Sequence, residues 1–108
     1  MLSNRELAEF LEVRDSELHG KGLFARVDIE NEAYLGTYKG TASKENDTYV
    51  LWVEDSKDNW IGRDGRNILK YLNHSEDPCC EFDGFDLYAI RDINAGEELT
   101  FFYGDDPF

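Results

Sequence analysis

The stretch Lys70-Tyr71-Leu72-Asn73-His74-Ser75-Glu76-Asp77-Pro78 decides how this chain folds, because an amide, an imidazole and a hydroxyl follow an apolar run and a proline soon ends the segment. The apolar run covers residues 68–72. An amphipathic helix has no need of three consecutive polar side chains at this place. The pattern therefore predicts one helical turn or a short strand that delivers hydrogen-bonding groups into a fixed pocket.

The length and charge of the chain limit what surrounds that pocket. Its 108 residues are enough for one domain with a modest core. It carries 11 basic and 24 acidic residues, which gives a formal net charge of -13. Such a surface repels nucleic-acid phosphates and attracts Lys/Arg-rich peptides, so we expect a basic protein or peptide partner and no direct nucleic-acid contact. The alternative, that the acidic surface serves solubility alone, stays open.

The N-terminus has no apolar signal region, and no apolar run reaches the roughly 18 residues needed to span a bilayer. We expect a soluble intracellular protein without a membrane partner, in the cytoplasm or, in a eukaryotic cell or host, in the nucleus. Cys79 and Cys80 are adjacent, a spacing unsuited to an ordinary disulfide or to a C-x-x-C metal site. We interpret them as reduced thiols.

Short β-segments dominate the pattern. A short helix is expected in residues 3–11, capped by Ser3 or Asn4 and with Glu6 in its first turn. Strands are expected at residues 11–14, 23–25, 33–38 (closing at Gly40), 49–53 paired with 60–62 as a hairpin, 87–90 and 99–103, and a helical turn at residues 67–72. This spacing predicts a mostly-β domain of small twisted sheets with little helix.

One internal echo links two parts of the chain at an offset of 64 residues. Ala25, Asp28, Ile29, Leu35 and Gly40 recur as Ala89, Asp92, Ile93, Leu99 and Gly104. We interpret the echo as two similar turn-and-strand units, because a repeat array needs at least three copies.

Several site chemistries can be weighed from the residues alone. The Gly20-Lys21-Gly22 loop is too short for a dinucleotide fingerprint, and by itself it indicates a turn. A serine-histidine hydrolase at Ser75 and His74 fails because adjacent side chains generally point apart. A metal site is not expected, since the available ligand types match no familiar zinc spacing; they are His19, His74, Cys79 and Cys80.

Four motifs in a fixed order resemble the SET-domain protein-lysine methyltransferases. They are His-Gly-Lys-Gly-Leu-Phe-Ala at residues 19–25, Tyr-Lys-Gly at 38–40, the segment 67–75 with Pro78, and Gly-Glu-Glu-Leu-Thr-Phe-Phe-Tyr-Gly at 96–104. The resemblance covers residues 11–106 and is strongest to the minimal SET proteins of some viruses and bacteria. It implies a β-clip fold of several small twisted sheets with a C-terminal pseudoknot. It also implies one SET domain over residues 1–108 (core 11–106), with no pre-SET segment and no zinc-binding post-SET segment.

The resemblance also implies a site. S-adenosylmethionine (SAM) would be the cofactor and S-adenosylhomocysteine (SAH) the product, without a metal. Tyr103 matches the catalytic tyrosine and Tyr38 the second tyrosine of the lysine channel, while Phe101, also in the channel, implies room for di- or trimethylation. The residues implied to hold the cofactor are Gly20, Lys21, Gly22, Tyr49, Lys70, Asn73 and His74.

The expected function is therefore SAM-dependent methylation of lysine in a basic protein or histone-like tail. The alternative is a SET-like module that binds basic peptides with weak or no turnover. The chain departs from the family pattern at Glu76, Cys79 and Phe102, where cysteine, asparagine and aspartate are usual, and Lys70 stands in place of arginine. These changes leave one wall of the site unaccounted for, which a homodimer or the tail 105–108 would have to close.

Overall fold

The structure is a computed structural model that describes residues 3–18, 20–45, 49–54 and 59–102. Its helices are α1 (Asn4–Leu7) and the 3-10 helix η1 (Ile68–Tyr71). Its strands are β1 (Leu11–Asp15), β2 (Lys21–Ala25), β3 (Tyr34–Thr37), β4 (Gly40–Ser43), β5 (Val50–Glu54), β6 (Trp60–Gly65), β7 (Asn73–His74), β8 (Cys80–Asp83), β9 (Asp86–Ala89) and β10 (Glu98–Phe101). None of the helices in these described ranges is long and apolar enough to cross a membrane.

The N-terminal helix is capped as its sequence predicts. The Ser3 hydroxyl accepts from the Glu6 N–H at 3.2 Å, and the Glu6 carboxylate accepts from the Ser3 N–H at 3.3 Å, which together form a capping box. The helix ends earlier than predicted, because Leu11 already pairs with Ala25 as the first residue of β1. Cross-strand pairing there overrides the apolar period that suggested a longer helix.

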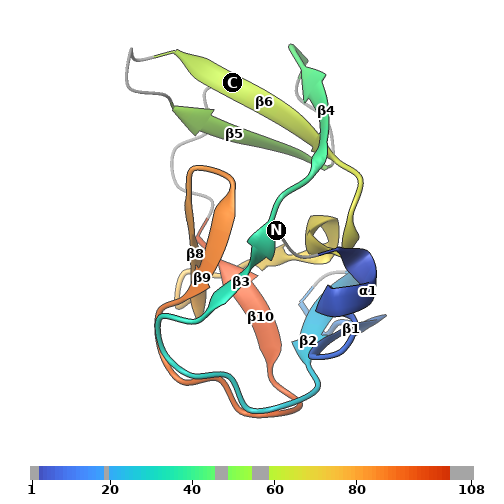
Figure 1. Cartoon of the computed structure of the whole chain (residues 1–108), viewed down its shortest axis with the longest axis vertical. Coiled ribbons are helices and arrows are strands. Elements are labelled where there is room, and N and C mark those ends of the chain that lie inside the picture. Colours follow the sequence, from blue (N-terminus) through green and yellow to red (C-terminus); the bar gives the residue numbers. More distant parts are fainter. Residues whose placement is uncertain (1–2, 19, 46–48, 55–58, 103–108) are drawn as a thin grey trace.

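Strand β10 organises the larger sheet, whose order is β1-β2-β10-β8-β9-β3. It runs antiparallel to β2 on one side and parallel to β7 and β8 on the other, and Figure 1 shows it near the centre of the lower part of the molecule. Strand β10 thus lies between the β1–β2 hairpin and the segment that holds Asn73 and His74. The predicted mostly-β fold of small sheets with a C-terminal pseudoknot is confirmed.

The internal echo corresponds to two loops that pair with each other. Ile29 and Ile93 exchange backbone hydrogen bonds of 2.7 and 2.8 Å across an antiparallel bridge. The aspartate before each isoleucine, Asp28 or Asp92, accepts from a backbone N–H of the opposite loop at 2.9 Å. The two similar units are therefore arranged with approximate two-fold symmetry, and Figure 1 shows their loops running side by side.

The smaller sheet has the order β4-β6-β5 and forms one end of the molecule (Figure 1). Its β5–β6 pairing confirms the predicted hairpin. Gly40 begins β4 instead of closing the preceding strand, which corrects that prediction, and β8 is a strand that was not expected. Both strands are only four residues long, and pairing with long-range partners stabilises them.

The core contains both cysteines. Cys79 and Cys80 are free thiols with no exposed surface, and their sulfur atoms lie 3.7 Å apart. Hydrogen bonds to its sulfur, first from the Cys80 thiol and then from the Thr100 N–H, lower the pKa of Cys79. The same contact, together with burial, raises the pKa of Cys80. Cys79, the residue before β8, thereby contacts the backbone of β10.

Candidate active site

Predicted site residues from four parts of the chain surround one cavity of about 190 Å³. The cavity lies where β5, η1, β7 and β10 meet. Six of its lining residues are among those that the sequence singles out: Tyr38, Tyr49, Lys70, Asn73, His74 and Phe101. The other lining residues are apolar: Val50, Leu51, Leu69, Leu72 and Phe82.

Tyr38 forms a buried wall of this cavity, with 5% of its surface exposed. Its hydroxyl donates to the Tyr49 carbonyl oxygen at 2.5 Å. Gly65 makes room for the ring, because a Cβ at that position would contact the Tyr38 hydroxyl and lie 2.7 Å from its Cζ. The hydroxyl proton is thus directed to the backbone, and what Tyr38 presents to a ligand is its ring and its oxygen lone pairs.

Phe82 completes the aromatic wall. Its ring makes edge contacts with Tyr38 and with Phe101, with centroids 5.8 and 5.3 Å apart and interplanar angles of 88° in both pairs. These are favoured geometries for aromatic pairs. Phe82 was missed because its strand was not predicted, and the only local signal is an aromatic residue between acidic ones near Gly84.

Lys70 places a cation at the cavity. It lies in the last turn of η1, and its ammonium is 4.9 Å from the ring centre of Tyr49 and 5.2 Å from that of Tyr71. The two rings also meet edge to face. Aromatic faces attract a cation at this distance, so the rings hold the ammonium where an anionic ligand group can meet it.

Asn73 connects the cavity to the glycine loop. Its amide nitrogen donates to the Lys21 carbonyl oxygen at 3.1 Å and to Glu98 Oε2 at 2.8 Å. The loop needs its glycines: Gly20 has a φ of 43°, and a Cβ at Gly22 would collide with the Glu98 carboxylate. Lys21 itself points to Asp15 in an exposed ion pair of 2.6 Å, a contact that lowers the pKa of Asp15 and raises that of Lys21.

The end of β10 passes beside His74. Phe101 and His74 are partners in the parallel pairing of β10 with β7, and the exposed His74 ring lies 5.3 Å from the ring of Phe102. The predicted catalytic residue Tyr103 and the first-motif residue His19 lie outside the described residues. In the described part of the chain, no group of three or more His, Cys, Asp or Glu side chains could hold a metal ion.

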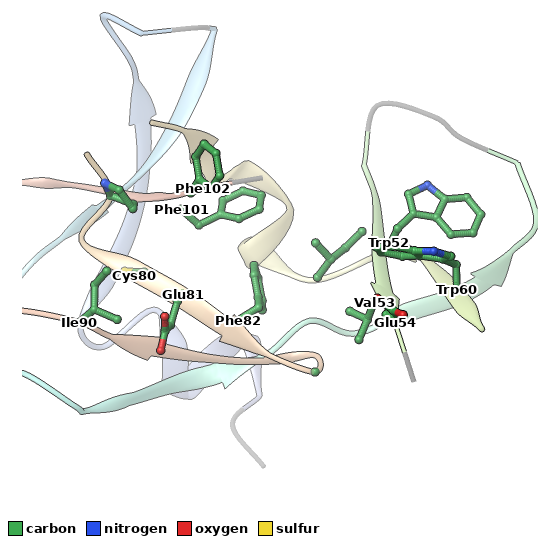
Figure 2. Close-up of a pocket in the computed structure, with 13 residues that line it drawn as sticks. Trp52, Val53, Glu54, Trp60, Cys80, Glu81, Phe82, Ile90, Phe101 and Phe102 are labelled. Carbon is green, nitrogen blue, oxygen red and sulfur yellow. The ribbon is translucent and has the colours of Figure 1, made fainter. Parts of the chain in front are cut away.

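An open groove adjoins the cavity on the side of the three-stranded sheet. Its volume is about 550 Å³, and it shares Leu51, Phe82 and Phe101 with the cavity. Figure 2 shows Trp52 and Trp60 on one side of the groove, Phe101 and Phe102 on the other, and Phe82 between them. Glu54 and Glu81 add negative charge along it.

This order of motifs around one cavity agrees with the comparison to known protein families. The SET domain profile matches residues 20–104. The chain belongs to the SET domain family. Among curated relatives, the probable histone-lysine N-methyltransferase set-23 of Caenorhabditis briggsae is 30% identical over 87% of this chain and 50% of its own length.

Other relatives share the domain in longer proteins. The variant-silencing SET domain-containing protein of Plasmodium falciparum is 29% identical over 86% of this chain, which corresponds to 5% of that protein. The H3 lysine-36 specific histone-lysine N-methyltransferase of Candida albicans is 28% identical over 97% of this chain and 15% of its own length. This SET domain is therefore related to lysine methyltransferases, and the chain spans half or less of the length of these relatives.

Proposed function

We propose that this SET domain is a SAM-dependent protein-lysine N-methyltransferase. The observation that carries the proposal is the gathering of Tyr38, Tyr49, Lys70, Asn73 and Phe101 around one cavity beside the glycine loop. The names of the curated relatives support the same reaction class.

The residues fit a cofactor of this kind. Lys70 offers a cation to the carboxylate of SAM, Asn73 and the backbone of Gly20–Gly22 offer hydrogen-bonding groups, and the aromatic wall suits a sulfonium. The cavity is smaller than the ~300–1,000 Å³ of most small-molecule sites. It would therefore take the reacting end of the cofactor, while the rest lies along the open face of the glycine loop.

The chemistry needs positioning more than a strong base. When bound, SAM would supply an electrophilic methyl group on a sulfonium, whose positive charge favours a neutral target amine. Tyr38, Phe82 and Phe101 would hold the lysine side chain in line and keep water away. Tyr103 is the proposed catalytic tyrosine, with its hydroxyl orienting the amine.

The substrate proposed is a basic protein segment. The net charge of -13 favours a Lys/Arg-rich partner. The groove beside the cavity would receive the residues that flank the target lysine, because Trp60 and Phe102 are 44% and 57% exposed there and Glu54 and Glu81 supply negative charge. We therefore expect a bulky apolar residue and a basic residue near the target lysine, as in a histone-like tail.

Calorimetry with SAM tests the cofactor part of the proposal. We expect saturable binding of SAM and SAH, weakened in Asn73→Ala. The absence of binding at millimolar SAM would contradict the proposal. Arrays of lysine peptides then test the substrate part: Glu81→Lys should lose preference for basic flanks, whereas the control Glu9→Lys, which makes the same charge change on an exposed residue beside α1, should keep it.

The second candidate is a SET-like binding module for basic peptides with little turnover. Phe102 favours it, since this exposed side chain replaces a usual aspartate next to Tyr103. Peptide binding without methyl transfer in the presence of bound SAM would select this candidate.

A further inference from the structure

We propose that Glu98 is a positioning residue that fixes the Asn73 side chain and the glycine loop in the arrangement that binds SAM. The inference rests on the proposed function and gives a role to a residue of the fourth motif that is not among the predicted site residues. Paired acids such as Glu97 and Glu98 are common in a chain with 24 acidic residues. The structure separates the two by their contacts.

Glu98 is a half-buried residue that uses both carboxylate oxygens across long sequence separations. Oε1 accepts from the Ser16 hydroxyl at 2.7 Å, and Oε2 accepts from the Asn73 amide at 2.8 Å. Ser16 stands just before the glycine loop, and its Oγ also accepts from the Leu18 N–H at 3.0 Å. The carboxylate thus joins the start of the loop to β7 through charge-assisted hydrogen bonds, which are stronger than neutral ones.

The contact with Asn73 determines which end of that amide faces a ligand. A side-chain amide has two N–H donors and one acceptor oxygen. The nitrogen donates to Glu98 and to the Lys21 carbonyl oxygen, so both donors are directed toward the loop and β10. The group that Asn73 brings to a cofactor is then its carbonyl oxygen, which suits a donor such as an ammonium group.

Gly22 adds a steric part to the same arrangement. A Cβ at Gly22 would collide with Glu98 Oε2, and it would lie 3.0 Å from the Ser16 Cβ. The carboxylate therefore occupies the space that a side chain on the loop would fill. By contrast, Glu97 has other partners. It forms an ion pair with Arg91 at 3.1 Å, and it accepts from the Asn94 N–H.

The first test is the affinity for SAM in four variants. Glu98→Ala should raise the Kd for SAM about tenfold, because a hydrogen bond to a charged group contributes about 1.4 kcal/mol or more. Glu98→Gln should restore much of the affinity, since its amide oxygen can accept from Asn73 while its nitrogen donates to Ser16. Ser16→Ala should have a smaller effect, and Glu97→Ala should match the unaltered protein.

A double-mutant cycle shows whether Glu98 acts through Asn73. If it does, Asn73→Ala and the double variant Asn73→Ala/Glu98→Ala should have nearly the same Kd, because residues in one network have non-additive effects. If the double variant instead loses affinity by the product of the two single losses, the inference is overturned, as it is by a Glu98→Ala protein with unchanged affinity for SAM. Thermal unfolding of each variant identifies losses of affinity that come from unfolding of the protein.

A measurement without cofactor separates this inference from the proposed function. In the unliganded protein, NMR should show slow solvent exchange of the Asn73 side-chain N–H protons, and fast exchange in Glu98→Ala but not in Glu97→Ala. Slow exchange that persists in Glu98→Ala refutes the positioning role. Failure of the unaltered protein to bind SAM refutes the proposed function. The NMR exchange measurement needs no cofactor, so it still decides whether Glu98 positions Asn73.

Discussion

Replacing Phe82 with leucine should weaken the wall between the cavity and the groove. The ring makes two edge contacts, with Tyr38 and with Phe101. Each such pair contributes about 0.5–1.5 kcal/mol beyond area burial. Leucine keeps most of the apolar burial, so we expect a loss of about 2 kcal/mol in the free energy of unfolding. For a domain of this size, that loss should lower the Tm by about 10 °C.

Urea denaturation at pH 7 measures this loss, provided that the m-value is unchanged. The control is Phe10→Leu, which removes another half-buried ring that packs against the core outside the cavity and the groove. Equal losses in the two variants would refute the special role of the Phe82 wall. In methylation assays Phe82→Leu should lower kcat more than it raises the Kd for SAM, because the ring faces the channel and not the glycine loop.

Three further changes test other parts of the site. Gly65→Ala should destabilise the protein by about 1–3 kcal/mol, because the new Cβ would lie 2.7 Å from Tyr38 Cζ and 2.8 Å from Lys70 Cβ, and an unchanged Tm would contradict this packing. Glu97→Gln should destabilise the protein near neutral pH, since the Asn94 N–H and Arg91 hold the pKa of Glu97 below its usual 4.5. The difference in Tm between this variant and the unaltered protein should fade as the pH falls below that value. A full difference at about pH 3 would contradict this. Phe101→Tyr should shift the product toward monomethyl-lysine in mass spectra, because a hydroxyl would narrow the channel at the ring that Phe82 contacts at 5.3 Å.

The local parts of the fold could be predicted from the sequence. The Ser3 cap, the β1–β2 and β5–β6 hairpins and the turn before Asn73 follow from propensity and spacing within a few residues. The four ordered motifs also predicted the overall fold and the site residues, because residues such as Asn73 and Tyr38 carry a family resemblance that no single element shows. Six of the residues that they single out line the cavity, and the roles assigned to these residues stay predictions.

Long-range partners could not be predicted in the same way. The role of Glu98 depends on Ser16, which is 82 residues away, and that of Phe82 depends on a strand of only four residues whose partners are distant in sequence. The echo at an offset of 64 residues was visible, but its meaning was not, because only the structure shows that Ile29 pairs with Ile93. Contacts of this kind arise from the topology around β10 and not from local preference.

The most direct test of the account is methyl transfer itself. The protein should be incubated with methyl-labelled SAM and core histones or basic peptides, and the products analysed by mass spectrometry. We predict labelled methyl-lysine in more than one methylation state, and loss of the label in Tyr103→Phe although that variant still binds SAM. Bound SAM without any labelled lysine, or equal transfer by Tyr103→Phe, would contradict the account.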